Sequence, residues 1–294
     1  MTIRRTHRLL WVVPLIACSP HALFAKETAS RFAGTLFYSR LTQGTWQVWQ
    51  RDLATDERAQ RTFSPGDKRY PSWAGNGRIA FCTANQDCYA LRDGRAAPDP
   101  LLERLWPVKD VVWSPDGARV AFARFRTDLA DNANVWVAFA DGSDQRMLTH
   151  EPGIQYNPSW SPDGTQLVYT GGQGYGTYEL YVINADGTNQ RRLTHNTHHE
   201  FLPAWSPDGA RIAFASDASG DYEIWVMRAD GSDAKPLTRS PGLDTRPAWS
   251  PDGSRIAFVT NRTGTLEIWV MNPDGSDQRP LERAEGGVCD PAWR

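Results

Sequence analysis

Long apolar runs are absent from this sequence, and positive charge is not concentrated in any part of it. The most apolar stretch, residues 9–17, is interrupted by Pro14 and is shorter than the roughly 20 residues that a membrane-spanning helix needs. The 32 basic residues are spread among 34 acidic ones, and the formal net charge is −2. Because nucleic-acid binders usually carry a concentrated basic face, we expect neither a transmembrane segment nor a nucleic-acid partner.

Motifs of several common enzyme classes are also missing. The sequence contains no G-x-S-x-G, no P-loop and no H-E-x-x-H, which would indicate a nucleophile, a phosphate-binding loop or a zinc-binding helix. Their absence favours a non-catalytic protein, and we expect no cofactor. The sequence does contain 40% hydrophobic residues and 13 tryptophans, which is ample material for a packed core and predicts a globular protein.

The first 25 residues read as a targeting segment. Arg4, Arg5 and Arg8 precede the apolar stretch, and "HALFA" ends at Ala25 with a small residue suited to cleavage. This pattern is typical of a secretory signal peptide over residues 1–25. A second interpretation stays open, because "LIAC" resembles the lipobox of bacterial lipoproteins, in which cleavage precedes the cysteine and lipid is attached to it, here at Cys18. Both interpretations predict a periplasmic protein, either soluble or lipid-anchored.

Three cysteines follow this leader. Cys82 and Cys88 flank "TANQD", a spacing that lets them face each other across a hairpin. Because an exported protein meets oxidising conditions, we predict a disulfide between them. Cys289 is left over, and we interpret it as a buried free thiol.

A repeat with a period of about 40–47 residues fills the rest of the chain. "PAWSPDGARIAF" (203–214) recurs in near-copies, with "WSPDG" intact in four of them. Such a period indicates stacked supersecondary units. The tryptophans that mark the repeat are Trp73, Trp113, Trp160, Trp205, Trp249 and Trp293.

Each repeat contains four short strand patterns. "PAW" and "RIAFAS" flank the turn "SPDG", while "YEIWVM" and "KPLT" flank "ADGSD". We therefore predict an all-β fold over residues 31–294, a six-bladed β-propeller of four-stranded blades. The sequence ends at "DPAWR", just after a first strand, whereas the patterns before Trp73 lack one. We expect the C-terminal strand to join the N-terminal blade and close the ring, which leaves no exposed edge.

These repeats resemble the WD40-like repeats of the TolB family. The resemblance rests on "PAWSPDG", "RIAF", "EIWVM", "DG" and "LT", and it covers nearly all of the chain after the leader. It implies a six-bladed propeller and a non-catalytic, protein-binding role in the bacterial cell envelope. The implied partner is an envelope protein such as a peptidoglycan-associated or outer-membrane lipoprotein, bound by a monomer. The family's separate N-terminal α/β domain is not seen in this sequence.

The candidate binding surface is the side of the ring whose loops differ among repeats. One of these loops, "HNTHHE", contains His195, His198 and His199 beside Glu200. A solvated loop, a metal site and a contact to a protein or an anion are all compatible with it. Polar residues shortly before the repeat tryptophans are expected at the mouth of the central channel, where they could hold a basic segment of a partner or a cation: Glu200, Asp244, Arg246 and Asp290.

Two functions from different classes follow from these features. The first is an exported, non-catalytic scaffold that docks a protein. The alternative is a metal-dependent lyase or hydrolase that acts on a glycan in the channel, which the histidine loop alone favours. Some pectin-fragment lyases use related propeller repeats with a histidine-bound metal, but those histidines come from several blades, whereas here only His150 follows the leader outside this loop.

Overall fold

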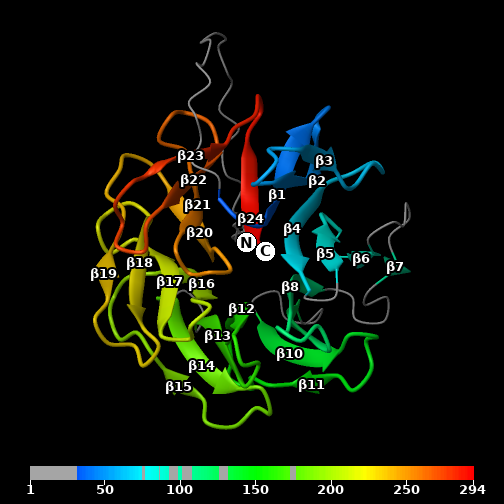
Figure 1. Cartoon of the computed structure of the whole chain (residues 1–294). Coiled ribbons are helices and arrows are strands. Elements are labelled where there is room, and N and C mark those ends of the chain that lie inside the picture. The colour runs from blue at the N-terminus through cyan, green and yellow to red at the C-terminus, as the bar shows by residue number, and fades with distance from the viewer. Residues whose placement is uncertain are drawn as a thin grey trace, which may run out of the picture.

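The computed structural model describes residues 32–74, 77–85, 87–92, 99–100, 108–125, 132–172 and 177–294. All regular elements in this part of the chain are β-strands, which confirms the all-β prediction. Figure 1 shows the strands grouped in sheets around a common centre, as in a β-propeller. The predicted leader, including Cys18, lies outside the described residues.

Four separate sheets have four strands each, and hydrogen-bonded neighbours within them run antiparallel. The strand at one edge lies nearest the centre of the ring, and the strand at the other edge lies outermost (Figure 1). In order from the centre the four sheets are β24 (Val288–Trp293), β1 (Thr35–Thr42), β2 (Thr45–Asp52) and β3 (Arg58–Gln60); β4 (Lys68–Trp73), β5 (Arg78–Thr83), β6 (Cys88–Arg92) and β7 (Asp99–Pro100); β16 (Glu200–Trp205), β17 (Arg211–Ser216), β18 (Glu223–Arg228) and β19 (Lys235–Pro236); and β20 (Asp244–Trp249), β21 (Ile256–Thr260), β22 (Glu267–Met271) and β23 (Arg279–Glu282).

The other eight strands form one continuous sheet, so the prediction of six four-stranded blades is wrong in its count. The sheet has the order β15-β14-β13-β12-β10-β9-β8, with β11 paired to β10. Its strands are β8 (Val108–Trp113), β9 (Arg119–Phe125), β10 (Ala133–Phe139), β11 (Arg146–Met147), β12 (Ile154–Trp160), β13 (Gln166–Gly172), β14 (Glu179–Asn184) and β15 (Arg191–Arg192).

The physical basis of this merger is one contact between neighbouring repeats at the start of β10. The outer strand β11 covers β10 only at Trp136 and Val137, but β19 covers β18 at two residues as well without such a merger. Ala133 of β10 pairs in parallel with Ile154 of β12, and the Ala133 amide donates to the carbonyl of Gly153 at 3.1 Å. The 40-to-47-residue spacing of the tryptophans cannot reveal this pairing, because it depends on one backbone contact between two repeats.

The C-terminal strand closes the ring as predicted. β24 pairs antiparallel with β1, and Figure 1 shows these two ends of the chain side by side. The amide of Thr35 donates to the carbonyl of Arg294 at 2.8 Å, and the amide of Arg294 donates back at 2.9 Å. The N-terminal sheet therefore obtains its innermost strand from the other end of the chain.

Both faces of the inner strands are buried. All five residues of β21 are buried, and in β17 only the first is not. Such strands need a covering layer on each side, which the neighbouring sheets of the ring provide. One packed cluster, for example, joins Ala213 and Ile224 of one sheet to Trp249 and Phe258 of the next.

The two recurring turns are held by their own polar side chains. In "SPDG" the Ser206 hydroxyl accepts from the Arg211 amide at 2.9 Å, and Asp208 accepts from the Ala210 amide at 3.0 Å. In "ADGSD" Asp230 accepts from the amide of Ser232 at 2.9 Å. These side chains replace the backbone partners that a tight reversal lacks, which explains why both turns recur.

One disulfide and one free cysteine lie in the described part of the chain. Cys82 and Cys88 are bonded to each other across the β5–β6 hairpin, and Cys289 is a buried free thiol. Within the described ranges, no helix has the length and apolar character needed to cross a bilayer.

Candidate functional site

The innermost strand of every repeat carries the same backbone irregularity. Three residues before each repeat tryptophan stands a non-glycine residue with φ between 50° and 58°. The pairing register shifts at this point, so each of these residues lies in a bulge. We call the six residues the axial ring: Tyr70, Asp110, Asn157, Leu202, Arg246 and Asp290.

Contacts between members show that these residues approach one another inside the ring. Asn157 donates its side-chain amide to Asp110 at 3.0 Å, and Arg246 lies 3.1 Å from Asp290. The Arg246 guanidinium also lies over the ring of Tyr70, 5.0 Å from its centroid. Arg246 and Tyr70 belong to β20 and β4, which have β24 between them, so this contact crosses the inner side of the molecule.

Asp290 is the electrostatic centre of the axial ring. Its side chain is 2% exposed and forms ion pairs with Arg246 at 3.1 Å and with Arg69 at 3.2 Å. Burial opposes ionisation of Asp290, but Arg246 and Arg69 outweigh it and lower its pKa. At Asp110 the effect of burial is the larger one. Burial raises the pKa of Asp110, and the opposing effects of Arg246 and its other partners do not cancel this rise. Asp290 is therefore ionised, and its charge orients two guanidinium groups.

Glu200 and Asp244, which we expected at the channel mouth, are buried between repeats instead. Their exposures are 1% and 0%. Glu200 accepts from Asn196 at 2.9 Å, and Asp244 forms an ion pair with Arg262 at 2.7 Å. Of the four polar residues expected together, the structure thus brings Arg246 and Asp290 into contact and directs the other two into the seams between sheets.

The three histidines of the 195–200 loop have different surroundings. His195 is exposed, and His198 lies 3.8 Å from the carboxylate of Asp217. His199 accepts a hydrogen bond from the Tyr178 amide through Nδ1 at 3.3 Å, which places its ring proton on Nε2. Across the described part of the chain, no three His, Cys, Asp or Glu side chains are grouped so that they could hold a metal ion.

His199 is part of an aromatic cluster that the sequence analysis missed. Its ring stacks on Phe201 with a centroid distance of 5.9 Å. Phe201 in turn contacts Tyr178, Tyr156 and Tyr222 at centroid distances of 5.1–6.1 Å. All five side chains are half-buried, and Phe201 immediately precedes Leu202 of the axial ring. The cluster therefore adds a partly exposed aromatic surface beside the ring.

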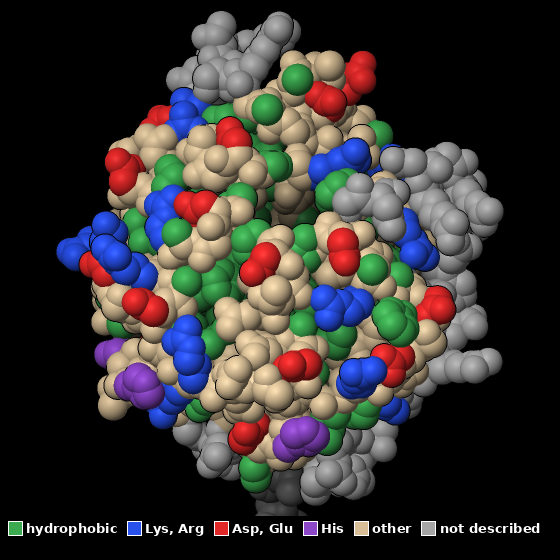
Figure 2. Space-filling view, turned by 60° about the horizontal axis from the view of Figure 1, so that its bottom comes forward, with side chains coloured by type: hydrophobic (Ala, Val, Ile, Leu, Met, Phe, Trp, Pro, Cys, Tyr) green, Lys and Arg blue, Asp and Glu red, His purple; other side chains and the backbone are tan. Residues whose placement is uncertain are grey.

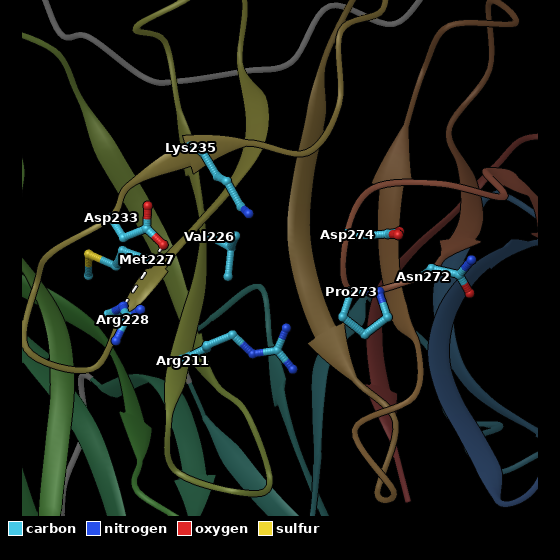
Figure 3. Close-up of a pocket in the computed structure, with 9 residues that line it drawn as sticks. All are labelled: Arg211, Val226, Met227, Arg228, Asp233, Lys235, Asn272, Pro273 and Asp274. Carbon is cyan, nitrogen blue, oxygen red and sulfur yellow. Dashed lines mark ion pairs between the residues drawn. The ribbon is translucent and has the colours of Figure 1, made fainter.

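The outer part of the molecule has a separate pocket of about 430 Å³. Figure 3 shows Arg211 and Lys235 pointing into it, with Asp274 at the right of the view and the Arg228–Asp233 ion pair, at 3.9 Å, at the left. Its lining includes no residue of the axial ring. On the face that Figure 2 presents, basic and acidic side chains are interspersed.

Tyr70 and Asp110 could have been found from the sequence. They occupy the same place, three residues before a repeat tryptophan, as Arg246 and Asp290, and the same offset applied to every repeat yields the whole axial ring. The role of Arg69 had no such signal, because its ion pair with Asp290 joins residues 221 positions apart.

Comparisons with known proteins agree with this architecture. A family model described as the TolB beta propeller domain matches residues 111–202 and 196–294, which is more than half of the chain. The Tol-Pal system protein TolB of Anaeromyxobacter dehalogenans (strain 2CP-C) is 31% identical over 133 residues, which are 44% of this chain and 30% of that protein. The match therefore spans less than a third of that relative's length.

Solved structures resemble the fold over most of the chain. A putative TolB from Agrobacterium tumefaciens superposes with a TM-score of 0.73 and 23% identity, covering 85% of this chain and 88% of that one. An oligogalacturonate lyase in complex with manganese gives a TM-score of 0.62 and 16% identity, covering 86% and 75%. Both show a shared fold and no more. Together with the family match, the repeats and the ring of sheets show that this chain belongs to the TolB beta propeller domain family.

Proposed function

We propose that this chain is an exported, non-catalytic propeller of the bacterial cell envelope that docks a protein partner over the axial ring. Membership of the TolB propeller family supports the class, and the Tol-Pal name of its curated relative supports an envelope partner, such as a peptidoglycan-associated or outer-membrane lipoprotein. The pattern of residues 1–25 supports export. The mass of the mature N-terminus distinguishes lipid attachment at Cys18 from cleavage after Ala25.

The observation that carries this proposal is the strained axial ring. A tyrosine, a leucine and an arginine each hold a positive φ at equivalent places, although bulky residues rarely adopt this conformation. Backbone strain of this kind concentrates at binding sites, where the surrounding structure maintains it. The ring also combines an apolar member, Leu202, with Arg246, whose side chain is held by Asp290, which suits a protein segment with both apolar and polar groups.

The alternative of a metal-dependent glycan lyase has no specific observation in its favour. The manganese-bound lyase shares the fold at 16% identity. His195, His198 and His199 do not converge, and they have protein partners or solvent around them. We therefore propose the docking role alone.

The substitution Leu202→Asp tests the docking surface. Aspartate tolerates the φ of 56° at this position, so the fold should persist while a charge replaces an apolar group of the axial ring. Met147→Asp is the matched control, because it makes the same kind of change at an exposed apolar residue on the outer strand β11.

The measurement is affinity capture of tagged residues 26–294 from cross-linked cell envelopes, followed by mass spectrometry. We expect the unaltered chain and Met147→Asp to capture the same envelope protein, and Leu202→Asp to capture at least about tenfold less of it at an unchanged Tm. Equal capture by all three would contradict docking over the axial ring.

A further inference from the structure

Two pairs of carboxyl groups lie in successive seams between repeats. Glu179 of β14 and Glu200 at the start of β16 both accept hydrogen bonds from Asn196. Glu223 of β18 and Asp244 at the start of β20 both accept from Ser240. The four residues are 2%, 1%, 3% and 0% exposed, respectively. Buried carboxylates usually face cations or hydrogen-bond donors, so two acidic pairs in equivalent positions require an explanation.

The first pair has donors for all of its oxygens except one. Glu200 accepts from the Thr194 hydroxyl at 3.1 Å and from the Asn196 side chain at 2.9 Å. Glu179 Oε1 accepts from the Asn196 amide at 3.2 Å and from Arg192. Glu179 Oε2 is buried and has no hydrogen-bond partner among the described residues. A proton held between the two carboxyl groups would supply the missing donor.

The second pair repeats this arrangement one sheet further on. Glu223 accepts from the Ser240 amide at 2.8 Å and from the Thr238 hydroxyl. Asp244 Oδ2 accepts from the Ser240 hydroxyl at 3.0 Å and from Arg262 at 2.7 Å. Asp244 Oδ1 is again buried without a hydrogen-bond partner in the described part of the chain. Each seam thus contains one unsatisfied carboxyl oxygen, which belongs to the third-strand residue in the first seam and to the first-strand residue in the second.

Another seam places amides where these seams place carboxyl groups. Asn134 and Gln155 occupy the positions equivalent to Glu179 and Glu200, and their side chains lie 3.0 Å apart. An amide carries its hydrogens at every pH, whereas a carboxyl group fills this place only when it is protonated. The comparison shows that this position in the repeat accepts a hydrogen-bonded pair of side chains.

We propose that each acidic pair, Glu179–Glu200 and Glu223–Asp244, binds one shared proton, and that release of these protons loosens the two seams as the pH rises. Two adjacent carboxylates in a low-dielectric seam repel each other, and their separation would move β16 and β20, which carry Leu202 and Arg246 of the axial ring. The proposal does not depend on the docking role.

The pKa values of the pairs agree with this geometry. Burial, followed by the charge and hydrogen bonding of Glu179, raises the pKa of Glu200 to about 7, although Asn196 and Thr194 act in the other direction. Burial and the facing Asp244 likewise raise the pKa of Glu223.

Among the described residues, few charged or titratable side chains lie near either pair. Arg192 faces Glu179, and Arg262 faces Asp244. Tyr222 lies near Glu200, and burial followed by Asp217 and Glu200 raises its pKa to about 12, so it stays neutral in this range. Asp221 and Arg239 line a pocket together with Glu223.

The sign of the pH effect follows from these pKa values. An unfolded glutamate titrates at about 4.3, so the folded chain binds more protons than the unfolded one between that pH and about 7. The stability that the raised pKa of Glu200 contributes is fully present below the pKa of glutamate in the unfolded chain. It is lost as the pH rises through the pKa of Glu200 in the folded chain. The turn aspartates, such as Asp208 and Asp230, have lowered pKa values and contribute the opposite slope at acidic pH. A variant must therefore be compared with the unaltered chain at each pH.

The test is the Tm of Glu200→Gln relative to the unaltered chain from pH 4.5 to pH 8. Glutamine donates permanently to Glu179, so we expect the difference in Tm to become more favourable to the variant by about 5 °C or more over this range. Glu267→Gln is the control, because Glu267 occupies in β22 the place that Glu179 has in β14 and Glu223 has in β18, but it pairs with Arg283 and Trp269 rather than with an acid. The difference in Tm between Glu267→Gln and the unaltered chain should not change with pH.

Two further measurements keep the proposal testable if Glu200→Gln does not fold. Glu223→Gln, which alters the second seam, should show the same pH-dependent gain in Tm relative to the unaltered chain. In the unaltered chain with ¹³C-labelled glutamate carboxyl groups, NMR should show two carboxyl resonances titrating above the range of free glutamate. A difference in Tm that is independent of pH, or the absence of such resonances, would overturn the proposal.

Discussion

At the scale of single residues, close approach between repeats determines which side chains are permitted. Gly231 in the "ADGSD" turn adopts a φ of 95°, and a Cβ there would lie 2.7 Å from the carbonyl oxygen of Leu193 in the preceding repeat. A Cβ at Gly275, in the same turn of the next repeat, would likewise lie 2.5 Å from the carbonyl oxygen of Leu237. The glycine of this turn therefore serves two purposes, the left-handed backbone and the contact with the neighbouring repeat.

We predict that Gly231→Ala destabilises the protein more than Gly220→Ala does. Both glycines have a positive φ, so both substitutions introduce strain of roughly 1–2 kcal/mol. Only Gly231 faces a backbone atom, since nothing lies within 4 Å of a Cβ at Gly220. Overpacking against Leu193 should add about 1–3 kcal/mol. Chemical denaturation of the two variants measures the difference, and equal losses would argue against a tight seam at Gly231.

At the scale of strands and turns, the repeat made most of the architecture predictable. The strands, the two turns and the closing strand follow from short runs of β-branched and aromatic residues, from Asp-Gly pairs and from the position of the last "PAW". Three features depend on contacts that no local pattern encodes: the Ala133–Ile154 pairing, the Arg69–Asp290 ion pair and the burial of Glu200 and Asp244. Polar residues at the start of a strand can turn toward the axis or toward a seam, and the sequence does not distinguish these directions.

The repeat tryptophans fasten each inner strand to the preceding repeat. Trp249 is 6% exposed, donates its indole N–H to the carbonyl of Ala204 at 3.2 Å, and has the Arg211 guanidinium 4.7 Å from its ring centroid. We predict that Trp249→Ala lowers the free energy of unfolding by roughly 3–5 kcal/mol, because it removes this packing and leaves a cavity.

The control for Trp249→Ala is Phe139→Ala, which truncates an aromatic side chain that is 47% exposed at the end of β10. We expect this second change to stay within about 0.5 kcal/mol of the unaltered chain in denaturant titrations. A loss at Trp249 as small as that at Phe139 would show that the tryptophan does not contribute to the core between repeats.

At the scale of the whole molecule, closure of the ring links the two ends of the chain. β24 supplies the inner neighbour of β1, and the Trp293 indole donates to the carbonyl of Ala33 at 3.1 Å. Without β24, strand β1, whose residues 36–39 are buried, would present an open edge, a structure that promotes association with other chains. We therefore expect closure to affect both the stability of the chain and its tendency to associate.

We predict that deletion of residues 288–294 lowers the Tm by more than about 10 °C and causes concentration-dependent association, measured by thermal unfolding and light scattering.

The matched control is a permuted chain in which the same residues precede residue 32 through a short linker. Because Thr35 and Arg294 already exchange two hydrogen bonds, the permuted strand can occupy the same place, and the Tm should largely recover. If the deletion variant remains a monomer with an unchanged Tm, the strand closes the ring without stabilising it. Recovery in the permuted chain would instead show that what matters is the presence of this strand beside β1, not its position at the end of the sequence.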